Sequence, residues 1–452
     1  MNLLRDALAL AIEALCWIEL KGFNERLALI SASRQLRIRS PNAMGLAHKM
    51  VLETLRRQNF LDFMINSVLP AHEGLSSIND LSPAVRAFLR LYAYETKIRK
   101  HDSLEKAINM TKTGRFVLGW RRLRVAEKIF GDLLSLEPKR VLKSTSNAQK
   151  VSFQLFQPLW FVKYCFKLFG RHEALRYFRS TLSTTPTYIR INTLIKSEEE
   201  ALAELCNEEL VLEKVEGLMH TYKVVKKKQP LARTSSFNNG LFYIQDKASS
   251  LAIEVAAPQA HMVVLDVCAA PGAKTTYMAQ LMENQGTIIS VDYSKRRMRI
   301  WKQEIKRMSV DTATPIIGDA YNLPIHNVKA DIVILDPPCT GTGTFNRTPS
   351  AKWRLSKNSI KNMTGIQWKM LNSCAELVKD EGSLVYSTCS ITVEENEMLI
   401  ERFLKWHPEF MLIKTRPQIG LQGLRGQADS QRLYPHIHEC NGFFITKLAK
   451  KI

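Results

Sequence analysis

From about residue 245 onward, short apolar runs alternate with segments of helical periodicity, and this alternation constrains the fold more than any other feature. Strands that are buried on both faces form such runs, and helices between them are the connections that parallel strands need. The pattern predicts an α/β domain with a mainly parallel sheet over residues 246–452. The predicted strands are VVLDVCA (263–269), TIISVD (287–292), TPIIGDA (314–320), ADIVILDPP (330–338) and GSLVYSTC (382–389).

The first 140 residues have apolar side chains three and four positions apart, which predicts an all-helical domain. The pattern is repeated over residues 84–99 and 121–134. A solvated helix face and an RNA-contacting face both remain open for the basic residues of this region. The first apolar stripe comprises Leu3, Leu4, Ala7, Leu8, Ala11, Ile12 and Leu15, and the basic residues include Lys112, Arg115, Arg121, Arg122 and Arg124.

Residues 150–245 mix the two kinds of pattern and predict a small α+β module. PTYIRINTL (186–194) and HTYKVVKKK (220–228) are expected to be strands, and SEEEALAELC (197–206) a helix. Lys226, Lys227 and Lys228 form either a solvated edge or a phosphate contact. Because 452 residues exceed what one hydrophobic core usually serves, we expect three domains, at 1–140, 150–245 and 246–452.

The chain carries 64 Lys and Arg against 43 Asp and Glu, a formal net charge of +21. An excess of this size attracts polyanions, and nucleic acid is the expected partner, although solubility alone is the simpler explanation. Charge does not distinguish RNA from DNA.

The eight cysteines include no C-x-x-C pair, which argues against a zinc ribbon or a redox motif, and no metal is expected. Such thinly spread thiols are typical of reduced, cytoplasmic proteins. The first twenty residues contain charged side chains and no cleavage site, so they predict an amphipathic helix rather than a signal peptide. No apolar stretch is long enough to predict a membrane span.

The end of the first predicted strand leads through Ala270-Pro271-Gly272-Ala273-Lys274 into a helix. A tight loop of small residues before a helix lets a ligand approach backbone N–H groups at the carboxyl end of a sheet. The second strand ends in Asp292, where a carboxylate can bind ribose hydroxyls, and the third in Asp319, where it can bind the adenine amine. This combination suits a nucleoside without phosphate and suggests S-adenosylmethionine.

The fourth predicted strand ends in Asp336-Pro-Pro-Cys339, and the fifth in Ser387-Thr-Cys389. Carbon 5 of cytosine becomes nucleophilic only after a thiolate adds to C6, and an acid near N3 must absorb the developing charge. Asp336 is placed to serve N3. Since adjacent parallel strands lie about 4.8 Å apart, either Cys339 or Cys389 can supply the thiolate.

Five ordered motifs resemble the Sun/RsmB-type RNA cytosine-5 methyltransferases. The resemblance covers roughly residues 150–452 and implies a class I Rossmann-like domain with a mainly parallel seven-stranded sheet. Residues 1–140 resemble the NusB-type RNA-binding domain in length, position and helical character. The motifs are Asp266-Val-Cys-Ala-Ala-Pro-Gly-Ala-Lys-Thr275, Val291-Asp292, Gly318-Asp319-Ala320, Asp336-Pro-Pro-Cys-Thr-Gly341 and Ser387-Thr-Cys-Ser390. They are joined by Arg190-Ile-Asn-Thr193, Tyr243-Ile-Gln-Asp-Lys-Ala-Ser-Ser250 and Asn441-Gly-Phe-Phe-Ile-Thr-Lys447, the last resembling a terminal antiparallel strand.

The resemblance also implies a role for each site residue. Cys389 would be the nucleophile, Cys339 would assist C5 deprotonation and product release, and Asp336 with Lys274 would contact cytosine. Ala273 stands where a second glycine is common in the family. The expected cofactor-binding residues are Cys268, Ala269, Ala270, Pro271, Gly272, Ala273, Lys274, Asp292, Arg297, Asp319 and Asp336.

The expected activity is S-adenosylmethionine-dependent formation of 5-methylcytosine in RNA by a monomeric enzyme. Small-subunit rRNA is the favoured substrate because of the NusB-like region, and tRNA is the alternative. A DNA cytosine-5 methyltransferase would use Cys339 as the nucleophile, and the complete Thr388-Cys389-Ser390 motif argues against it. A non-catalytic RNA-binding assembly factor would bind the cofactor without transferring methyl groups.

Overall fold

The structure is a computed structural model and describes residues 3–71, 75–99, 102–138, 142, 145–323, 325 and 328–451. The chain divides into two compact units. Unit 1 comprises Met1–Ser183 and Phe345–Arg354, and unit 2 comprises Thr184–Thr344 and Leu355–Ile452. The three-domain division stays a prediction, and its first boundary, near residue 140, lies outside the described residues.

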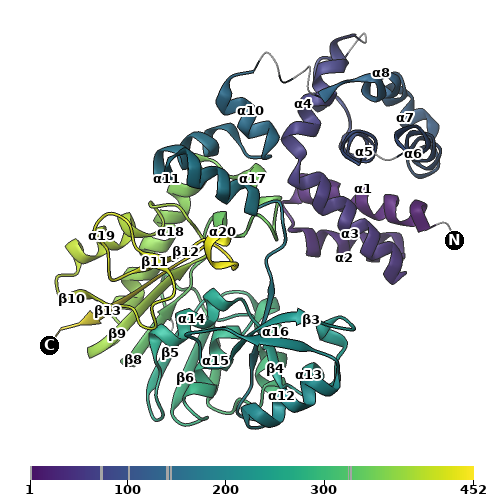
Figure 1. The fold of residues 1–452 in the computed structure, drawn as a ribbon. Coiled ribbons are helices and arrows are strands. Elements are labelled where there is room, and N and C mark those ends of the chain that lie inside the picture. The colour runs from purple at the N-terminus through teal and green to yellow at the C-terminus, as the bar shows by residue number, and fades with distance from the viewer. Residues whose placement is uncertain are drawn as a thin grey trace. The chain divides into compact units, whose positions relative to one another are not determined.

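Unit 1 is helical, as predicted for its N-terminal region (Figure 1). The predicted stripe of the first helix faces the core from Ala7 to Leu15, whereas Leu3 is 47% exposed. Ser40 caps the third helix by accepting a hydrogen bond from the backbone N–H of Ala43, and Pro41 occupies the first turn, where no N–H is needed. The elements of unit 1 are α1 (Leu3–Lys21), α2 (Glu25–Leu36), α3 (Pro41–Arg56), α4 (Gln58–Val68), η1 (Leu69–Ala71), η2 (Ile78–Asp80), α5 (Pro83–Ala93), η3 (Tyr94–Ile98), α6 (Ser103–Leu118), α7 (Trp120–Glu127), α8 (Phe130–Ser135), α10 (Asn147–Gln154), α11 (Leu159–Ser180) and α17 (Ala351–Arg354).

Two segments predicted as continuous helices are interrupted. The helix expected over 84–99 continues as a π-helical turn, η3, after Ala93, and the one expected over 121–134 is broken between α7 and α8. Leu123, Ala126, Ile129 and Leu133 are nevertheless all buried. The apolar period therefore runs through the break, and periodicity alone does not reveal it.

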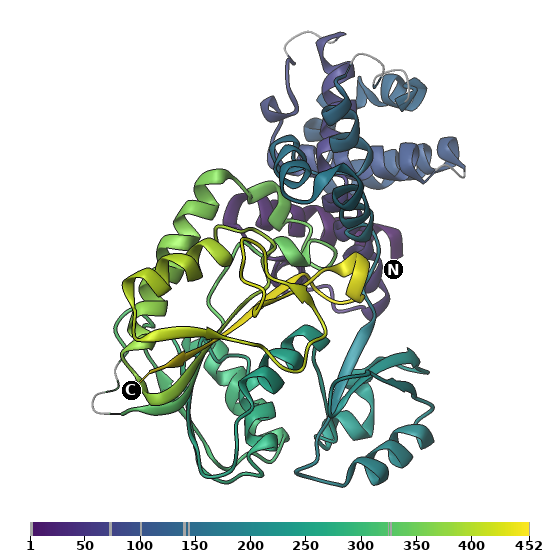
Figure 2. The ribbon, with the colours of Figure 1, turned by 60° about the vertical axis from the view of Figure 1, so that its left-hand side comes forward.

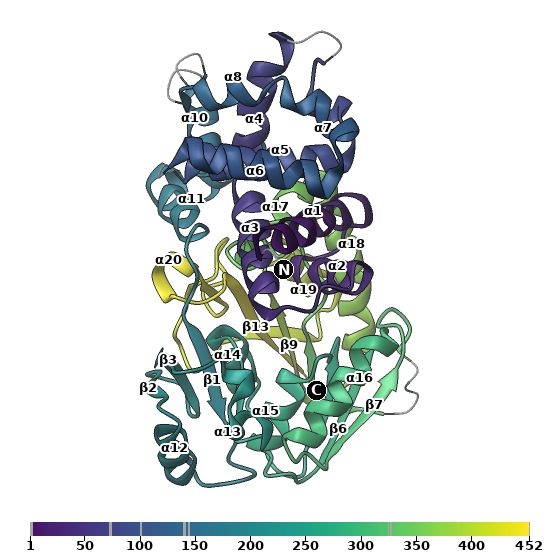
Figure 3. The ribbon, with the colours of Figure 1, turned by 90° about the vertical axis from the view of Figure 1, so that its right-hand side faces the viewer.

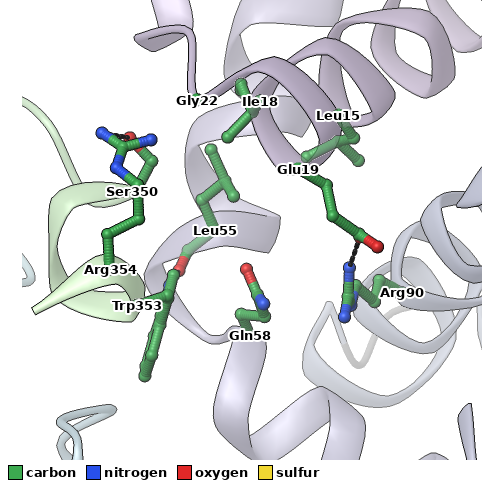
Figure 4. A pocket seen from close by; sticks show the side chains of 10 residues that line it. All are labelled: Leu15, Ile18, Glu19, Gly22, Leu55, Gln58, Arg90, Ser350, Trp353 and Arg354. Atoms are coloured by element: carbon green, nitrogen blue, oxygen red, sulfur yellow. Dashed lines mark hydrogen bonds and ion pairs between the residues drawn. The ribbon is translucent and has the colours of Figure 1, made fainter. Parts of the chain in front are cut away.

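Residues Phe345–Arg354 return from the second half of the chain to the helices of unit 1. Lys352 is completely buried, and its ammonium group donates hydrogen bonds to the backbone oxygens of Arg56, at 3.0 Å, and Phe156, at 2.8 Å. The indole Nε1–H of Trp353 donates to the oxygen of Leu55 at 2.6 Å. Figure 4 shows Trp353 beside a pocket that α1 also lines. Unit 1 is thus built from two separate stretches of chain.

Unit 2 begins with the predicted small module, a four-stranded antiparallel sheet in the order β2-β3-β1-β4. Ser197 and Glu200 form a capping box that begins its helix. Figure 3 shows the strands beside α12 and α13. The elements are β1 (Thr187–Ile191), α12 (Glu198–Asn207), β2 (Val211–Lys214), β3 (Thr221–Lys226), η4 (Leu231–Arg233), α13 (Ser235–Asn238) and β4 (Phe242–Ile244).

The main sheet of unit 2 has the predicted mainly parallel architecture. All five predicted strands are present, as β5 to β9, and neighbouring members of this group are parallel. The predicted tail strand is β13, antiparallel to β9. Within the described residues the sheet has nine strands rather than seven, because short C-terminal segments add β10, β11 and β12. The order is β11-β12-β13-β9-β8-β5-β6-β7, with β10 paired to β13.

Helices cover both faces of this sheet (Figure 2). Alternate residues along each strand face opposite layers: Ile332 and Ile334 pack with α14, α15 and α16, whereas Val333 and Leu335 pack with α18 and α19. Because β5 to β9 run parallel, their carboxyl ends lie at the same edge of the sheet. The remaining elements are α14 (Lys247–Ala256), β5 (Val263–Val267), α15 (Ala273–Leu281), β6 (Thr287–Asp292), α16 (Lys295–Arg307), β7 (Ala313–Ile317), β8 (Ala330–Leu335), η5 (Thr342–Thr344), α18 (Lys357–Ala375), β9 (Val378–Thr388), α19 (Glu397–Trp406), β10 (Phe410–Ile413), β11 (Leu421–Gln422), β12 (Gln431–Leu433), α20 (Pro435–His438) and β13 (Phe443–Lys450).

Candidate active site

The loop between β5 and α15 turns sharply at its two ends. Cys268 has a φ of 67° and Gly272 a φ of 112°, both in the left-handed region. A Cβ atom at Gly272 would lie 3.2 Å from Cδ1 of the Trp301 ring. The backbone N–H groups of Cys268 and Ala269 donate to the oxygen of Val291 at 2.9 and 3.0 Å. These contacts hold the loop against the end of β6.

Asp292, the last residue of β6, is almost completely buried and braces the same loop. Its Oδ2 accepts a hydrogen bond from the N–H of Ala270 at 3.2 Å and lies 3.1 Å from Nη1 of Arg297. The Arg297 guanidinium also donates to the backbone oxygen of Ala270. The structure therefore brings together the loop, Asp292 and Arg297.

Asp319 follows β7, and β7 is paired with β6, so its carboxylate belongs to the same edge of the sheet. It is exposed, and its Oδ1 accepts a hydrogen bond from the N–H of Tyr321 at 3.0 Å. Tyr293 and Tyr321, which sequence reasoning did not single out, are 71% and 38% exposed beside the two acids. A Gly272 position that excludes a side chain, two strand-end carboxylates and two accessible aromatic rings fit an adenosyl ligand without phosphate.

Cys339 and Cys389 face each other across the neighbouring strands β8 and β9. Their Sγ atoms are 3.1 Å apart, and both thiols are free. The hydrogen bond to Cys389, together with burial, raises the pKa of Cys339 well above its usual value. Cys339 is therefore held protonated, with Cys389 as its hydrogen-bond partner.

Lys274, at the start of α15, forms an ion pair with Asp336 at the end of β8. Burial lowers the pKa of Lys274, but the charges of Asp336, Asp266 and Cys389 outweigh burial and raise it overall. The ammonium group therefore stays charged close to the Asp336 carboxylate and the Cys389 sulfur. Lys274 thus connects the predicted cofactor loop to the predicted cytosine-binding acid.

Glu395 is a further site residue that sequence reasoning missed. It is completely buried, and its carboxylate accepts hydrogen bonds from both cysteine-bearing loops. Oε1 accepts from the N–H of Thr340 at 2.8 Å, and Oε2 from the hydroxyls of Thr340 at 2.5 Å and Ser390 at 2.6 Å. Further donors are the hydroxyl of Thr392, at 2.7 Å from Oε2, and the amide of Gln367, at 3.0 Å from Oε1. The dense run of hydroxyl residues after Cys389 was the available signal, because buried hydroxyl groups need acceptors.

Two glycines bring a further segment against the cysteine loops. The N–H of Gly343 donates to the oxygen of Cys389 at 2.9 Å, and a Cβ at Gly343 would lie 2.0 Å from the oxygen of Gly442. Only glycine fits this close approach of two backbones. The turn after Cys339 is thereby packed against the residues that lead into β13.

Asp266 lies inside β5, below the ion pair of Lys274. Its Oδ2 accepts a hydrogen bond from the Thr275 hydroxyl at 2.6 Å, and burial raises the pKa of Asp266 to about 6.

The small module packs against α15 through Arg190. This buried side chain donates to Oε1 of Gln245 at 3.0 Å and to Oγ1 of Thr276 at 2.7 Å. The predicted Arg190 motif therefore serves packing against α15.

Two absences concern the described part of the chain alone. Among these residues, no group of three or more His, Cys, Asp and Glu side chains has an arrangement that could hold a metal ion. No helix in the same part of the chain is long and apolar enough to cross a membrane.

Comparison with known proteins agrees with the geometry of this site. Residues 253–449 match the family described as 16S rRNA methyltransferase RsmB/F. A protein of Bacillus subtilis (strain 168) named "Probable ribosomal RNA small subunit methyltransferase B" is 28% identical over 98% of both chains. The tRNA (cytosine(72)-C(5))-methyltransferase of Pyrococcus horikoshii is 36% identical over 53% of this chain and 60% of its own length.

The helical region is included in the structural similarity. The crystal structure of PH0851 covers 99% of this chain and 99% of its own, with a TM-score of 0.82 and 29% sequence identity. The chain belongs to the RsmB/F family of S-adenosylmethionine-dependent RNA cytosine-5 methyltransferases.

Proposed function

We propose that this RNA cytosine-5 methyltransferase acts on small-subunit ribosomal RNA, with Cys389 as the nucleophile and Cys339 as its assistant. The observation that carries the proposal is the pair of thiols 3.1 Å apart, beside Lys274 and Asp336. Two thiols at one position suit a reaction that must both attack C6 of the base and clear the product from the attacking sulfur.

The electrostatics of the site favour Cys389 for the attack. Cys339 keeps its proton, since its hydrogen bond to Cys389 and its burial raise its pKa. Lys274 lies close enough to Cys389 for the sulfur to raise the pKa of Lys274, so a positive charge stands beside the sulfur of Cys389 rather than that of Cys339. A covalent bond then forms between Sγ of Cys389 and C6 of cytosine, and the electron pair of the C5–C6 double bond makes C5 nucleophilic.

The other residues of the site transfer protons and hold the base in position. Asp336 faces N3 of the base and passes a proton to it as negative charge accumulates there, and the neighbouring Lys274 ammonium stabilises the carboxylate that results. A water molecule held by the Cys339 thiol accepts the C5 proton, the electrons of the broken C5–H bond restore the C5–C6 double bond, and the Cys389 thiolate leaves C6. When bound, S-adenosylmethionine supplies the methyl group.

We propose that the cofactor is held by the expected loop and strand ends. The left-handed Gly272 and the bracing of Ala270 by Asp292 and Arg297 support this assignment, because they fix the loop. Asp292 is expected to bind the ribose hydroxyls and Asp319 the adenine amine. The exposed ring of Tyr293 offers the adenine a stacking surface.

Full-length similarity to the Bacillus subtilis relative favours rRNA, because the match includes the helical region. The alternative substrate is tRNA. It is favoured by the higher identity to the Pyrococcus horikoshii enzyme, although that match covers a shorter stretch of the chain.

We also propose a cytoplasmic monomer. The reducing conditions of the cytoplasm would prevent a disulfide between the facing thiols of Cys339 and Cys389. A monomer suffices because all the proposed catalytic residues lie within one chain.

Methyl transfer to purified RNA tests the substrate. Small-subunit rRNA and total tRNA, each lacking the modification, are incubated with the protein and labelled S-adenosylmethionine, and the modified position is mapped by bisulfite sequencing. We expect 5-methylcytosine at a defined position of the rRNA. Methylation of tRNA alone would contradict the proposed substrate but not the chemistry, and labelling of neither RNA would contradict both.

A further inference from the structure

The outward face of α6 does not have the composition of an ordinary solvated helix face. Ala107, Met110 and Gly114 form its buried side. A Cβ at Gly114 would lie 2.5 Å from Cε2 of Phe88, so close packing on α5 fixes which side of α6 turns outward. That outward side exposes large apolar residues, with Leu104 at 65% and Phe116 at 68% exposure.

The next helix, α7, also exposes a large aromatic residue. Leu123 and Ala126 are buried, while Trp120 is 54% exposed at the start of α7. Arg121, Arg122 and Arg124 are also exposed. Two exposed aromatic residues and three exposed arginines therefore lie within nine residues of the chain, Phe116 to Arg124, around Gly119.

Arginines already lie over both aromatic rings. The guanidinium carbon of Arg124 is 5.8 Å from the centroid of the Trp120 ring, and that of Arg5 is 4.8 Å from the Phe116 ring. Aromatic rings stack with nucleobases of any sequence, and arginine adds both cation–π attraction and phosphate contacts.

The segment that spans the end of α6 and the whole of α7 carries a strong positive charge. Residues 112–128 contain six basic residues and one acidic residue, Glu127. Glu127 neutralises Arg115 through hydrogen bonds of 2.7 and 2.9 Å. The centre of a protein–protein interface is usually depleted of charge, so this density favours a polyanion over a protein.

We propose that this face of α6 and α7, defined by Phe116, Trp120, Arg121, Arg122 and Arg124, is a docking surface for single-stranded segments of the RNA substrate. Bases stack on Phe116 and Trp120, and the arginines contact phosphates. The inference rests on the proposed function, because the RNA that docks is the one that is methylated. It assigns to the helical unit a part in substrate capture rather than in chemistry.

The test compares full-length variants with matched controls in unit 1. Arg121→Glu with Arg122→Glu is paired with Arg26→Glu and Arg34→Glu on α2, which makes the same charge change at other exposed positions. Trp120→Ala is paired with Leu20→Ala, another exposed apolar residue. Filter binding to a transcript of small-subunit rRNA is measured over a range of salt concentrations, and methylation kinetics are measured on the same transcript. Circular dichroism verifies that each variant is folded.

We expect the double arginine variant to bind the transcript at least about 10-fold more weakly, and its logarithmic salt slope to fall by roughly 1.5 for two lost phosphate contacts. Trp120→Ala is expected to weaken binding about 5-fold or more, with an unchanged salt slope. In both variants KM for RNA rises, while kcat at saturating RNA remains that of the wild type.

The failure of this inference can be separated from the failure of the proposed function. If the wild type methylates the transcript but the surface variants bind it as tightly as their controls do, the docking surface is wrong and a protein partner is the better occupant. If the variants lose binding to the transcript while the wild type methylates tRNA alone, the surface still binds RNA but the proposed substrate is wrong.

Discussion

The carboxylate of Glu395 links the two loops that carry the reactive thiols, although it touches neither sulfur. It accepts hydrogen bonds from Thr340, which follows Cys339, and from Ser390, which follows Cys389. Because the distance between the thiols depends on where these loops lie, we regard Glu395 as a positioning residue. A buried carboxylate with this many donors is stable only while the donors remain in place.

Glu395→Ala should therefore lower kcat more than it affects binding. The variant leaves several buried donors without an acceptor, and we expect a loss of about 2–4 kcal/mol in the free energy of unfolding. We expect kcat to fall at least about 10-fold, with the Kd for S-adenosylmethionine changed less than about 2-fold, because the cofactor loop is not among its partners. Urea denaturation, steady-state methylation and calorimetry measure the three quantities.

Two further variants show whether the effect is specific. Glu395→Gln retains one acceptor oxygen and should recover part of kcat, whereas Glu216→Gln, at an exposed position of unit 2, should behave as the wild type. Equal effects of Glu216→Gln and Glu395→Gln on kcat would remove the positioning role.

The buried Asp266 should make stability depend on pH in the opposite sense to an ordinary carboxylate. Burial raises the pKa of Asp266 to about 6, from its ordinary value of 3.8. Between these values the native state binds more protons than the unfolded state, so the contribution of this group falls as pH rises. Over this interval the wild type should lose up to about 3 kcal/mol relative to Asp266→Asn.

Urea unfolding of both proteins at several pH values from 4.5 to 7.5 measures this difference. An Asn side chain can still accept the Thr275 hydrogen bond, so the comparison isolates ionisation. Parallel stability curves for the two proteins would show that Asp266 ionises with an ordinary pKa.

Single residues were predictable from the sequence where chemistry demands one residue type. Cys339, Cys389, Asp336 and Asp292 could be singled out because thiols and carboxylates at strand ends have few other uses. Glu395 could not, since its importance comes from burial and from partners that lie up to 55 positions away in the chain. Tertiary contacts of that kind leave at most the weak local signal of the neighbouring hydroxyl residues Ser390 and Thr392.

At the scale of elements, the loop between β5 and α15 joins the two halves of the site. It ends at Gly272 in a conformation that favours glycine, and it continues into α15, whose second residue is Lys274. The position of the Lys274–Asp336 ion pair thus depends on how the loop is turned. Glycine is required by its positive φ at 272, whereas Ala273 already belongs to α15.

Gly272→Ala should therefore be far more harmful than Ala273→Gly. An alanine at 272 would be strained by its positive φ and would bring Cβ to 3.2 Å from Trp301. We expect Kd for S-adenosylmethionine to rise at least about 10-fold, since a left-handed alanine costs roughly 1–3 kcal/mol. Ala273→Gly should reduce stability by at most about 1 kcal/mol and change Kd less than about 3-fold. Titration calorimetry compares them, and equal affinities would exclude the loop as the cofactor site.

Elements were predictable where one period dominates. Apolar runs revealed the five parallel strands, although β7, at the edge of the sheet, is only partly buried. β11 and β12 are two and three residues long, and so short a segment has no detectable period. The break between α7 and α8 was hidden because the buried residues keep their spacing across it.

At the scale of the whole molecule, the chain enters unit 1 twice, the second time only a few residues after Cys339. Residues Phe345–Arg354 are held there by Lys352, whose ammonium group binds two backbone oxygens rather than a carboxylate. Sequence periodicity could not reveal this return, because the segment has the composition of an ordinary loop. Burial lowers the pKa of Lys352 well below its usual value.

Lys352→Ala should loosen this second stretch of unit 1. The backbone oxygens of Arg56 and Phe156 lose their donor, and we expect amide hydrogen exchange of residues 346–354 to accelerate at least about 10-fold. Lys357→Ala, at an exposed position of α18, serves as the control and should leave these amides protected. Unchanged protection in Lys352→Ala would mean that the other contacts of the segment hold it unaided.

The central claim is that one cysteine attacks the RNA and the other releases it. Cys339→Ala, Cys389→Ala and the wild type are incubated with the RNA substrate and S-adenosylmethionine, and the products are separated on a denaturing gel. We predict that Cys339→Ala accumulates a covalent protein–RNA complex, because release is impaired, and that Cys389→Ala forms none. A stable adduct in Cys389→Ala would contradict the assignment of the nucleophile.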